Sequence, residues 1–187
     1  MALTTPGALG GEGADKKAAV ALAMNHFGVS EADLKKVLAA ALEKGGDYAD
    51  LFFEHTITNS IRLMDGAVNN SYSNIDYGVG VRVLIGDQSG YAYVENITVE
   101  DMLKAARTAA RIASANKGNK PLNLTEKELK KNYYTVASPW EEVSLKDKMP
   151  YLQKLNDRIF ALDKRVHKVQ ASQSDTLRIS SSAIRRE

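Results

Sequence analysis

Hydrophobic and polar residues alternate along the segment from Tyr77 to Ile85. Its odd positions are all apolar, namely Tyr77, Val79, Val81, Val83 and Ile85. A period of two residues with one apolar face predicts a β-strand, and the β-prone stretch Tyr91–Val94 predicts the returning strand of a hairpin. Gly78 and Gly80 leave the other face without side chains, so we expect a bulky group to lie close against the strand there.

The segment Tyr48–Met64 shows the same alternation over a greater length. Apolar residues prevail at alternate positions, which are Ala49, Leu51, Phe53, His55, Ile57, Asn59, Ile61 and Leu63. One dry and one wet face indicate an antiparallel sheet. Asp65-Gly66 predicts a tight turn, because glycine tolerates a positive φ, and the polar stretch Ala67–Ser73 predicts a strand near the edge of the sheet.

Apolar residues recur every three to four positions in other segments. Asp15–Phe27 is an alanine-rich helix candidate, and Gly28 is placed to end it. Ser30 predicts the cap of the next helix, with Asp33 as its capping-box partner, and Gly45-Gly46 predicts the end of that helix.

The most regular helical pattern is Thr98–Asn116. It presents a narrow stripe of mostly small apolar residues, which are Val99, Met102, Leu103, Ala106, Ala109, Ala110 and Ala113. Alanine permits a close approach to a sheet, so we expect Gly78 and Gly80 to receive this helix.

The last part of the chain begins with a polar connection, Lys117–Glu142, and continues into an amphipathic helix. Asp147 is the expected cap of that helix, because this choice places Pro150 in the first turn, where proline is tolerated. Two strands are predicted to follow, at Lys164–Ala171 and Thr176–Ser180, before a polar C-terminal tail.

Runs of strands between helices predict an α+β fold. We expect a mixed, mainly antiparallel sheet of about six strands that packs against two long amphipathic helices. The chain has 187 residues, enough for one well-buried domain, and we assign residues 15–187 to a single domain. Residues 1–14 are rich in glycine, alanine and threonine and are expected to form a flexible arm.

Composition narrows the functional classes. Cysteine is absent, which excludes disulfides, thiolate metal sites and cysteine nucleophiles. The 25 basic and 23 acidic residues leave a net charge of +2, so no nucleic-acid partner is indicated. The longest apolar run, Ala18–Met24, is too short to span a bilayer, and no signal peptide is visible in Met1–Asp15.

Three histidines, His26, His55 and His167, are scattered and lack the paired arrangement that zinc hydrolysis requires. His55 lies on an apolar strand face, where a hydrogen-bonded core histidine is favoured over a catalytic one. Asp76 and Arg82 flank the glycine strand and either take part in a surface or intersubunit ion pair or contact a ligand. A small enzyme that uses Asp76, Arg82 and His55 together is a further hypothesis.

Gly78-Val79-Gly80 lacks the third glycine of a dinucleotide fingerprint and lies inside a strand, so phosphate binding is not favoured. Core and hairpin packing is favoured over a binding surface for the aromatic residues Tyr91, Tyr93, Tyr133, Tyr134 and Trp140. The basic clusters at Lys127, Lys130 and Lys131 and at Arg185-Arg186 are interpreted as solvated surface.

The ordered set of motifs resembles the N-terminal region of the TldD/PmbA family, also known as modulators of DNA gyrase, and looks more like the TldD branch. The similarity covers most of the chain, from about Ser30 to Ile179. It rests on Asp47–Phe53, Asp65-Gly66, Asn74-Ile75-Asp76, Gly78–Arg82, Gly90–Tyr93 and Ala161–Ser172.

The resemblance implies a cytoplasmic zinc metallopeptidase that acts on unfolded or small peptides as a complex of two related subunits, TldD and PmbA. In the family the zinc motif lies downstream of the region matched here, so this chain is expected to be the non-catalytic N-terminal domain. Zinc is expected in the C-terminal domain, and no cofactor is expected in this chain. The implied partners are that peptidase domain, a related subunit in a hetero- or homodimer, and a peptide, with no nucleic acid and no membrane.

No catalytic or metal-binding residue is assigned, and this chain alone is expected to be inactive because it lacks the zinc motif. The candidate substrate or interface residues belong to the hairpin and are Asn74, Asp76, Arg82, Tyr91 and Tyr93. The domain would help to enclose the peptide site and to form the subunit interface. The alternative is a stand-alone peptide-binding module, in which an open sheet edge at Ala67–Ser73 pairs with an extended peptide.

Overall fold

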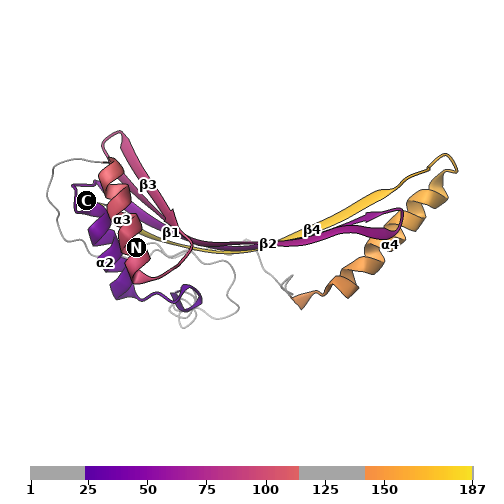
Figure 1. Ribbon diagram of the computed structural model, residues 1–187, viewed down its shortest axis with the longest axis horizontal. Coiled ribbons are helices and arrows are strands. Elements are labelled where there is room, and N and C mark those ends of the chain that lie inside the picture. The colour runs from indigo at the N-terminus through magenta and orange to yellow at the C-terminus, as the bar shows by residue number, and fades with distance from the viewer. Residues whose placement is uncertain (1–23, 114–141, 187) are drawn as a thin grey trace, which may run out of the picture. The chain divides into compact units, whose positions relative to one another are not determined.

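The chain forms an α+β fold around a four-stranded antiparallel sheet with the strand order β3-β2-β1-β4 (Figure 1). This computed structural model describes residues 24–113 and 142–186. The predicted α+β class is confirmed. The elements are α2 Glu31–Leu42, β1 Tyr48–Met64, β2 Ala67–Ile85, β3 Gln88–Val94, α3 Val99–Ala113, α4 Leu145–Leu162 and β4 Gln170–Arg186.

The described residues form two compact units. Unit 1 contains residues 24–55, 77–113 and 179–186, and unit 2 contains residues 56–76 and 142–178. Strands β1, β2 and β4 each contribute residues to both units. The assignment of residues 15–187 to one domain stays a prediction, and the expected arm at residues 1–14 lies outside the described residues.

Strand β1 begins and ends where the apolar alternation predicted, at Tyr48 and Met64. The predicted turn is also confirmed, because Asp65 (φ 49°) and Gly66 (φ 80°) both have the positive φ of a tight two-residue hairpin turn. Two hydrogen bonds tie this turn to the segment before β4. The Asp65 N–H donates to the Val169 carbonyl oxygen at 2.9 Å, and the Val169 N–H donates to the Asp65 carboxylate at 2.8 Å.

The prediction of about six strands is wrong for the described residues, because expected strands are joined into longer ones. Ala67–Ser73 and Tyr77–Ile85 belong to the single strand β2. β4 contains both the expected strand Thr176–Ser180 and the expected polar tail as far as Arg186, whereas residues 164–169 are not in a strand. The sequence predicts two strands in place of β2 because β2 is exposed at every position before Tyr77, and this part of the strand carries no apolar alternation.

The core of unit 1 lies between one face of the sheet and the helices α2 and α3, which lie side by side (Figure 1). The alternate apolar positions of β1 and β2 are buried in it as predicted, namely Ala49, Leu51, Phe53, Val79, Val81 and Val83. Helix α2 adds Leu34, Val37 and Leu38. Burial of these side chains is the main favourable term for unit 1.

Helix α3 packs against β3 at Gly90 and not, as predicted, against Gly78 and Gly80. A β-carbon on Gly90 would overlap the backbone carbonyl oxygen of Ala109 in α3. The register explains the difference. Gly90 pairs with the buried Val83 and so faces the helices, whereas Gly78 and Gly80 alternate to the opposite face of the sheet.

Helix α4 packs on the sheet in unit 2, where Leu152 contacts a cluster formed by Ile61, Leu63 and Ala171. Its N-cap is Ser144, whose N–H and hydroxyl both donate to the Asp147 carboxylate, at 3.1 and 2.6 Å. The prediction of Asp147 as the cap is therefore wrong.

Asp147 is the third residue of α4, where its carboxylate completes a capping box with Ser144. Pro150 consequently lies beyond the first turn. The helix continues through it to Leu162, because proline removes only one hydrogen bond, to the Lys146 carbonyl, and the remaining helix packs on the sheet.

Two other predicted segments fall largely outside the described residues, the first part of Asp15–Phe27 and the connection Lys117–Glu142. Residues 24–27 are helical, and Gly28 follows with a φ of 66°. A left-handed glycine at that point is the predicted helix end.

The predicted capping box of α2 is confirmed and makes a testable contribution to stability. The Asp33 N–H donates to the Ser30 hydroxyl oxygen at 3.1 Å, and the Ser30 hydroxyl and N–H donate to the Asp33 carboxylate at 2.6 and 3.0 Å. The hydroxyl bond, and after it the N–H bond, holds the pKa of Asp33 below its usual range. A carboxylate with a depressed pKa contributes stability at neutral pH that is lost as the pH falls through its folded-state pKa.

We therefore expect Ser30→Ala to lower the free energy of unfolding by about 1 kcal/mol at pH 7, measured by urea denaturation. The difference in stability between the variant and the wild type should narrow as the pH falls through the depressed pKa of Asp33, because Asp33 then becomes protonated in both proteins. Lys44→Ala, at an exposed position after the helix, is the control and should change little. An equal loss at pH 7 and at a pH low enough to protonate Asp33 would contradict the role of the carboxylate.

Candidate functional site

Three of the five predicted site residues lie on the outer face of the sheet in unit 1, opposite the helices. In the β2–β3 ladder, Arg82 pairs with Tyr91, and Gly80 pairs with Tyr93. A β-carbon on Gly80 would lie 2.5 Å from the Tyr91 hydroxyl oxygen, and Gly78 is covered in the same way by Tyr93. The bulky group predicted over the glycines is therefore a pair of tyrosines. Tyr91 and Tyr93 remain 59% and 50% exposed.

Arg82 is held on this outer face by Asp50 of β1. Its Nε donates to the Asp50 carboxylate at 2.8 Å, and its guanidinium carbon lies 5.8 Å from the centre of the Tyr48 ring. The hydrogen bond and charge of Asp50 raise the pKa of Arg82, and burial together with the Asp50 charge raises the pKa of Tyr48. Arg82 thus takes part in a surface ion pair, one of the roles considered for it, and its partner is Asp50.

The other two predicted site residues, Asn74 and Asp76, belong to unit 2. The Asn74 side-chain N–H donates to the Asp76 carboxylate at 3.1 Å, and both residues are exposed. Within the described residues, β3 pairs only with Val79–Ile85, so Ala67–Gly78 has no strand on that side. We call Ala67–Gly78 the free edge. It includes the polar stretch that the sequence placed near the edge of the sheet.

A histidine pair that the sequence did not reveal connects the helical turn before Gly28 to β1. Nε2 of His26 lies 2.8 Å from Nδ1 of His55, and the two rings stack with their centroids 5.0 Å apart. Tyr77 packs edge-on against His55 at 5.2 Å. His55 is hydrogen-bonded as expected, but it is half-buried rather than enclosed in the core.

The three residues of the small-enzyme hypothesis each contact a different neighbour. Arg82 contacts Asp50, Asp76 contacts Asn74, and His55 contacts the His26 ring. The described contacts therefore do not join Asp76, Arg82 and His55 into one constellation.

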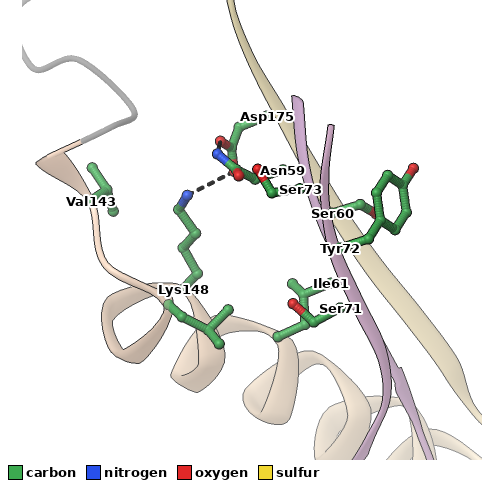
Figure 2. Close-up of a pocket in the computed structure, with 10 residues that line it drawn as sticks. Asn59, Ser60, Ile61, Ser71, Tyr72, Ser73, Val143, Lys148 and Asp175 are labelled. Carbon is green, nitrogen blue, oxygen red and sulfur yellow. Dashed lines mark hydrogen bonds and ion pairs between the residues drawn. The ribbon is translucent and has the colours of Figure 1, made fainter. Parts of the chain in front are cut away.

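Unit 2 contains a groove of about 340 Å³ beside the start of α4 (Figure 2), which we call the α4 groove. Its walls include Asn59 and Ile61 of β1, Ser71 and Ser73 of β2, Lys148 of α4 and Asp175 of β4. In Figure 2 the side chains of Asn59, Ser73 and Asp175 lie on the side of the sheet that faces α4, whereas Tyr72 points away from the helix. Because Ser71 and Ser73 also belong to the free edge, the groove adjoins that edge.

A buried ion pair lines the α4 groove. The Lys148 Nζ donates to one oxygen of the Asp175 carboxylate at 2.8 Å, and the Asn59 side-chain N–H donates to the other at 3.2 Å. Lys148 and Asp175 are only 6% and 7% exposed. Charges buried this deeply require a partner, so the three side chains act as a unit. Sequence reasoning missed this network, because Lys148 and Asp175 are separated by 27 positions and lie on a helix and a strand.

The remaining sequence candidates are either corrected or not described. Arg185 is buried, so its interpretation as solvated surface is wrong, because β4 continues through this residue and turns its side chain inward. The other aromatic and basic candidates lie outside the described residues and are Lys127, Lys130, Lys131, Tyr133, Tyr134 and Trp140.

Two negative findings apply to residues 24–113 and 142–186. No three histidine, cysteine, aspartate or glutamate side chains there are grouped to hold a metal ion, and the pair His26–His55 alone does not supply the ligand set of a zinc site. None of the helices in these residues is long and apolar enough to cross a membrane.

Comparison with known proteins assigns the hairpin region to a family domain. Residues 49–113, from β1 to the end of α3, match the model of the PmbA/TldA metallopeptidase domain 1. A metalloprotease TldD homolog of Haemophilus influenzae is 32% identical over 132 residues, which are 68% of this chain and 27% of the relative. A metalloprotease TldD homolog of Buchnera aphidicola is 28% identical over 149 residues, which are 80% of this chain and 31% of the relative.

A solved structure has the same fold. The crystal structure of a putative modulator of a DNA gyrase from Thermotoga maritima superposes with a TM-score of 0.59 at 20% identity, over 83% of this chain and 35% of the other. The fold and the matched region define the class, which is the first domain of a metallopeptidase family. The chain belongs to the PmbA/TldD family, and it spans only about three tenths of the curated TldD homologs that it matches.

Proposed function

We propose that this chain acts as the non-catalytic N-terminal domain of a TldD-like zinc metallopeptidase whose substrates are unfolded or small peptides. The observation that carries the proposal is the match of residues 49–113 to domain 1 of the family, in a chain that spans 27% of a relative named as a metalloprotease. In this proposal the zinc ion and its ligands belong to a C-terminal peptidase domain. The N-terminal domain helps to enclose the peptide and forms part of the contact with a related subunit, in the cytoplasm.

The outer face of unit 1 is the part of the chain that we assign to the subunit contact. It combines Tyr91, Tyr93 and Arg82, residue types that are enriched at protein interfaces. The two tyrosine rings are about half exposed, and Asp50 holds the guanidinium in place. Tyrosine side chains have only two rotatable torsions and so lose little conformational entropy on binding, which supports this assignment.

The proposal is tested by measuring zinc content and peptide cleavage of the 187-residue chain and of the longest product of its gene. We expect the longer product to contain one zinc ion per chain and to cleave unfolded peptides, and the 187-residue chain to do neither. A chelator should abolish cleavage by the longer product, which controls for contaminating serine and cysteine proteases. Zinc-dependent cleavage by the 187-residue chain would overturn the proposal.

A second candidate function is a stand-alone peptide-binding module, and the free edge favours it. An unpaired strand presents a row of N–H and C=O groups, and an extended peptide can add to it as a further strand. The free edge is exposed at every position before Tyr77 and consists mostly of polar residues there. Saturable chemical-shift changes at the amides of residues 67–78, on titration with unfolded peptides, would support this function. The absence of any shift across such peptides would remove it.

A further inference from the structure

We propose that the α4 groove is a side-chain pocket for an extended peptide bound at the free edge, and that it selects a neutral polar side chain. The inference rests on the peptide-binding function proposed above and adds the chemistry of recognition. The occupant is one residue of the added strand, with an amide or hydroxyl side chain such as glutamine, asparagine or threonine.

The position of the groove relates it to the free edge. Ser71, Tyr72 and Ser73 belong to the free edge and also line the groove. Side chains of a strand alternate between the two faces of the sheet. Ser71 and Ser73 lie on the α4 side, and Tyr72 lies on the other (Figure 2). A peptide strand beside them therefore directs every second side chain to the face on which the groove opens.

The charges of the groove argue against a charged occupant. Lys148 and Asp175 neutralise each other at 2.8 Å, and the second Asp175 oxygen is taken by Asn59. A charged peptide side chain in the groove would lose its hydration, and the Lys148–Asp175 pair has no net charge to compensate for this loss. Burial of an unpaired charge is costly in free energy. A lysine, aspartate or glutamate side chain is therefore disfavoured.

The neutral polar groups of the groove complement an amide or hydroxyl. The hydroxyl groups of Ser71 and Ser73 can each donate and accept, and the side-chain oxygen of Asn59 is an acceptor. Leu145 and Val143 add apolar surface, which suits the methylene or methyl groups of glutamine and threonine. A volume of about 340 Å³ is at the small end for ligand sites, so it fits a side chain better than a whole cofactor.

The test uses blocked nine-residue peptides of alternating alanine and valine that differ only at the central residue, so that no other side chain of the peptide carries an amide or hydroxyl group. The probes carry glutamine, threonine, lysine or aspartate there, and dissociation constants are measured by fluorescence anisotropy with the entire chain. We expect the glutamine and threonine peptides to bind about tenfold more tightly than the lysine and aspartate peptides. Equal binding of all four peptides would overturn the inference.

Two variants of Ser73 test whether the preference for glutamine arises from the α4 groove. Ser73→Trp fills the groove and is expected to remove the preference for glutamine. Ser73→Val keeps a strand-forming residue but removes the hydroxyl group. It should lower the affinity for the glutamine peptide three- to tenfold, which is the effect of one lost hydrogen bond. Ser172→Trp is the matched control, because Ser172 is exposed on β4 of the same unit and does not line the groove. A preference that survives both Ser73 variants would overturn the inference.

The same titrations distinguish failure of the pocket from failure of peptide binding. If the peptides shift the amides of residues 67–78 but show no preference at the central residue, only the side-chain pocket is refuted. If no peptide shifts these amides, peptide binding at the free edge fails and the pocket fails with it. Neither result bears on zinc content or cleavage by the longer product, which test the first proposed function separately.

Discussion

Replacing Gly90 with alanine is expected to lower the free energy of unfolding by about 3 kcal/mol, because it forces helix α3 away from the sheet. The new methyl group would overlap the Ala109 carbonyl oxygen and lie 2.8 Å from the Ala113 nitrogen. Both are backbone atoms, so no side-chain rotation relieves the clash. α3 supplies Met102, Ala106 and Ala109 to the core, and any shift of the helix also loosens that packing.

Thermal unfolding of Gly90→Ala, followed by circular dichroism, should show a fall in Tm of about 6–12 °C. Gly80→Ala is the informative comparison, because its methyl group meets only the side chain of Tyr91, which is largely exposed and can rotate away. We expect it to cost about 1 kcal/mol or less. Ser89→Ala, at an exposed neighbouring position on β3, is the neutral control. A Gly90→Ala protein as stable as Ser89→Ala would contradict the close approach of α3.

Replacing Asp175 with alanine is expected to destabilise unit 2 by about 3 kcal/mol, since breaking a buried ion pair leaves the other charge in a site with little water. The change removes the carboxylate from Lys148 and from Asn59 together. The loss is measured by urea denaturation, with amide signals of α4 and β4 as probes of this unit. The double variant Lys148→Met/Asp175→Leu should be more stable than Asp175→Ala, because it removes both charges and restores apolar volume.

The exposed pair of Arg165 and Asp163 provides the control for this prediction. These side chains are 2.6 Å apart and are 89% and 39% exposed, so solvent weakens their attraction. Asp163→Ala should leave the urea midpoint almost unchanged. Equal effects of Asp175→Ala and Asp163→Ala would show that burial does not give the Lys148–Asp175 pair its importance.

The predictions that succeeded depend on neighbours in the sequence. The limits of β1 follow from alternation along a single strand, and the Asp65-Gly66 turn and the Ser30 cap follow from preferences of adjacent residues. The prediction for the cap of α4 is wrong by three positions, because Ser144 and Asp147 belong to the same capping box. Of the two, Asp147 is the one that would place Pro150 in the first turn, and the sequence therefore favours it. Even this error concerns a choice within one helical turn.

The predictions that failed depend on which residues face each other. Tyr91 and Tyr93 rather than α3 cover the glycines of β2, because the β2–β3 register turns Gly78 and Gly80 to the outer face and Gly90 to the inner one. The part of β2 before Tyr77 is exposed at every position and has no apolar period, so the sequence predicts two strands where the structure has one.

The sequence by itself determined the α+β class, the hairpin around Asp65-Gly66, the apolar face of the core and the resemblance to the TldD/PmbA family. Each of these follows from local periodicity, turn chemistry or the order of motifs along the chain. Only the tertiary structure decided that Arg82 pairs with Asp50, that His26 meets His55 and that Lys148 and Asp175 share the α4 groove. These contacts join residues 27 to 32 positions apart on different elements. Strand register and helix packing bring such residues together, and neither can be read from residues that are neighbours in the chain.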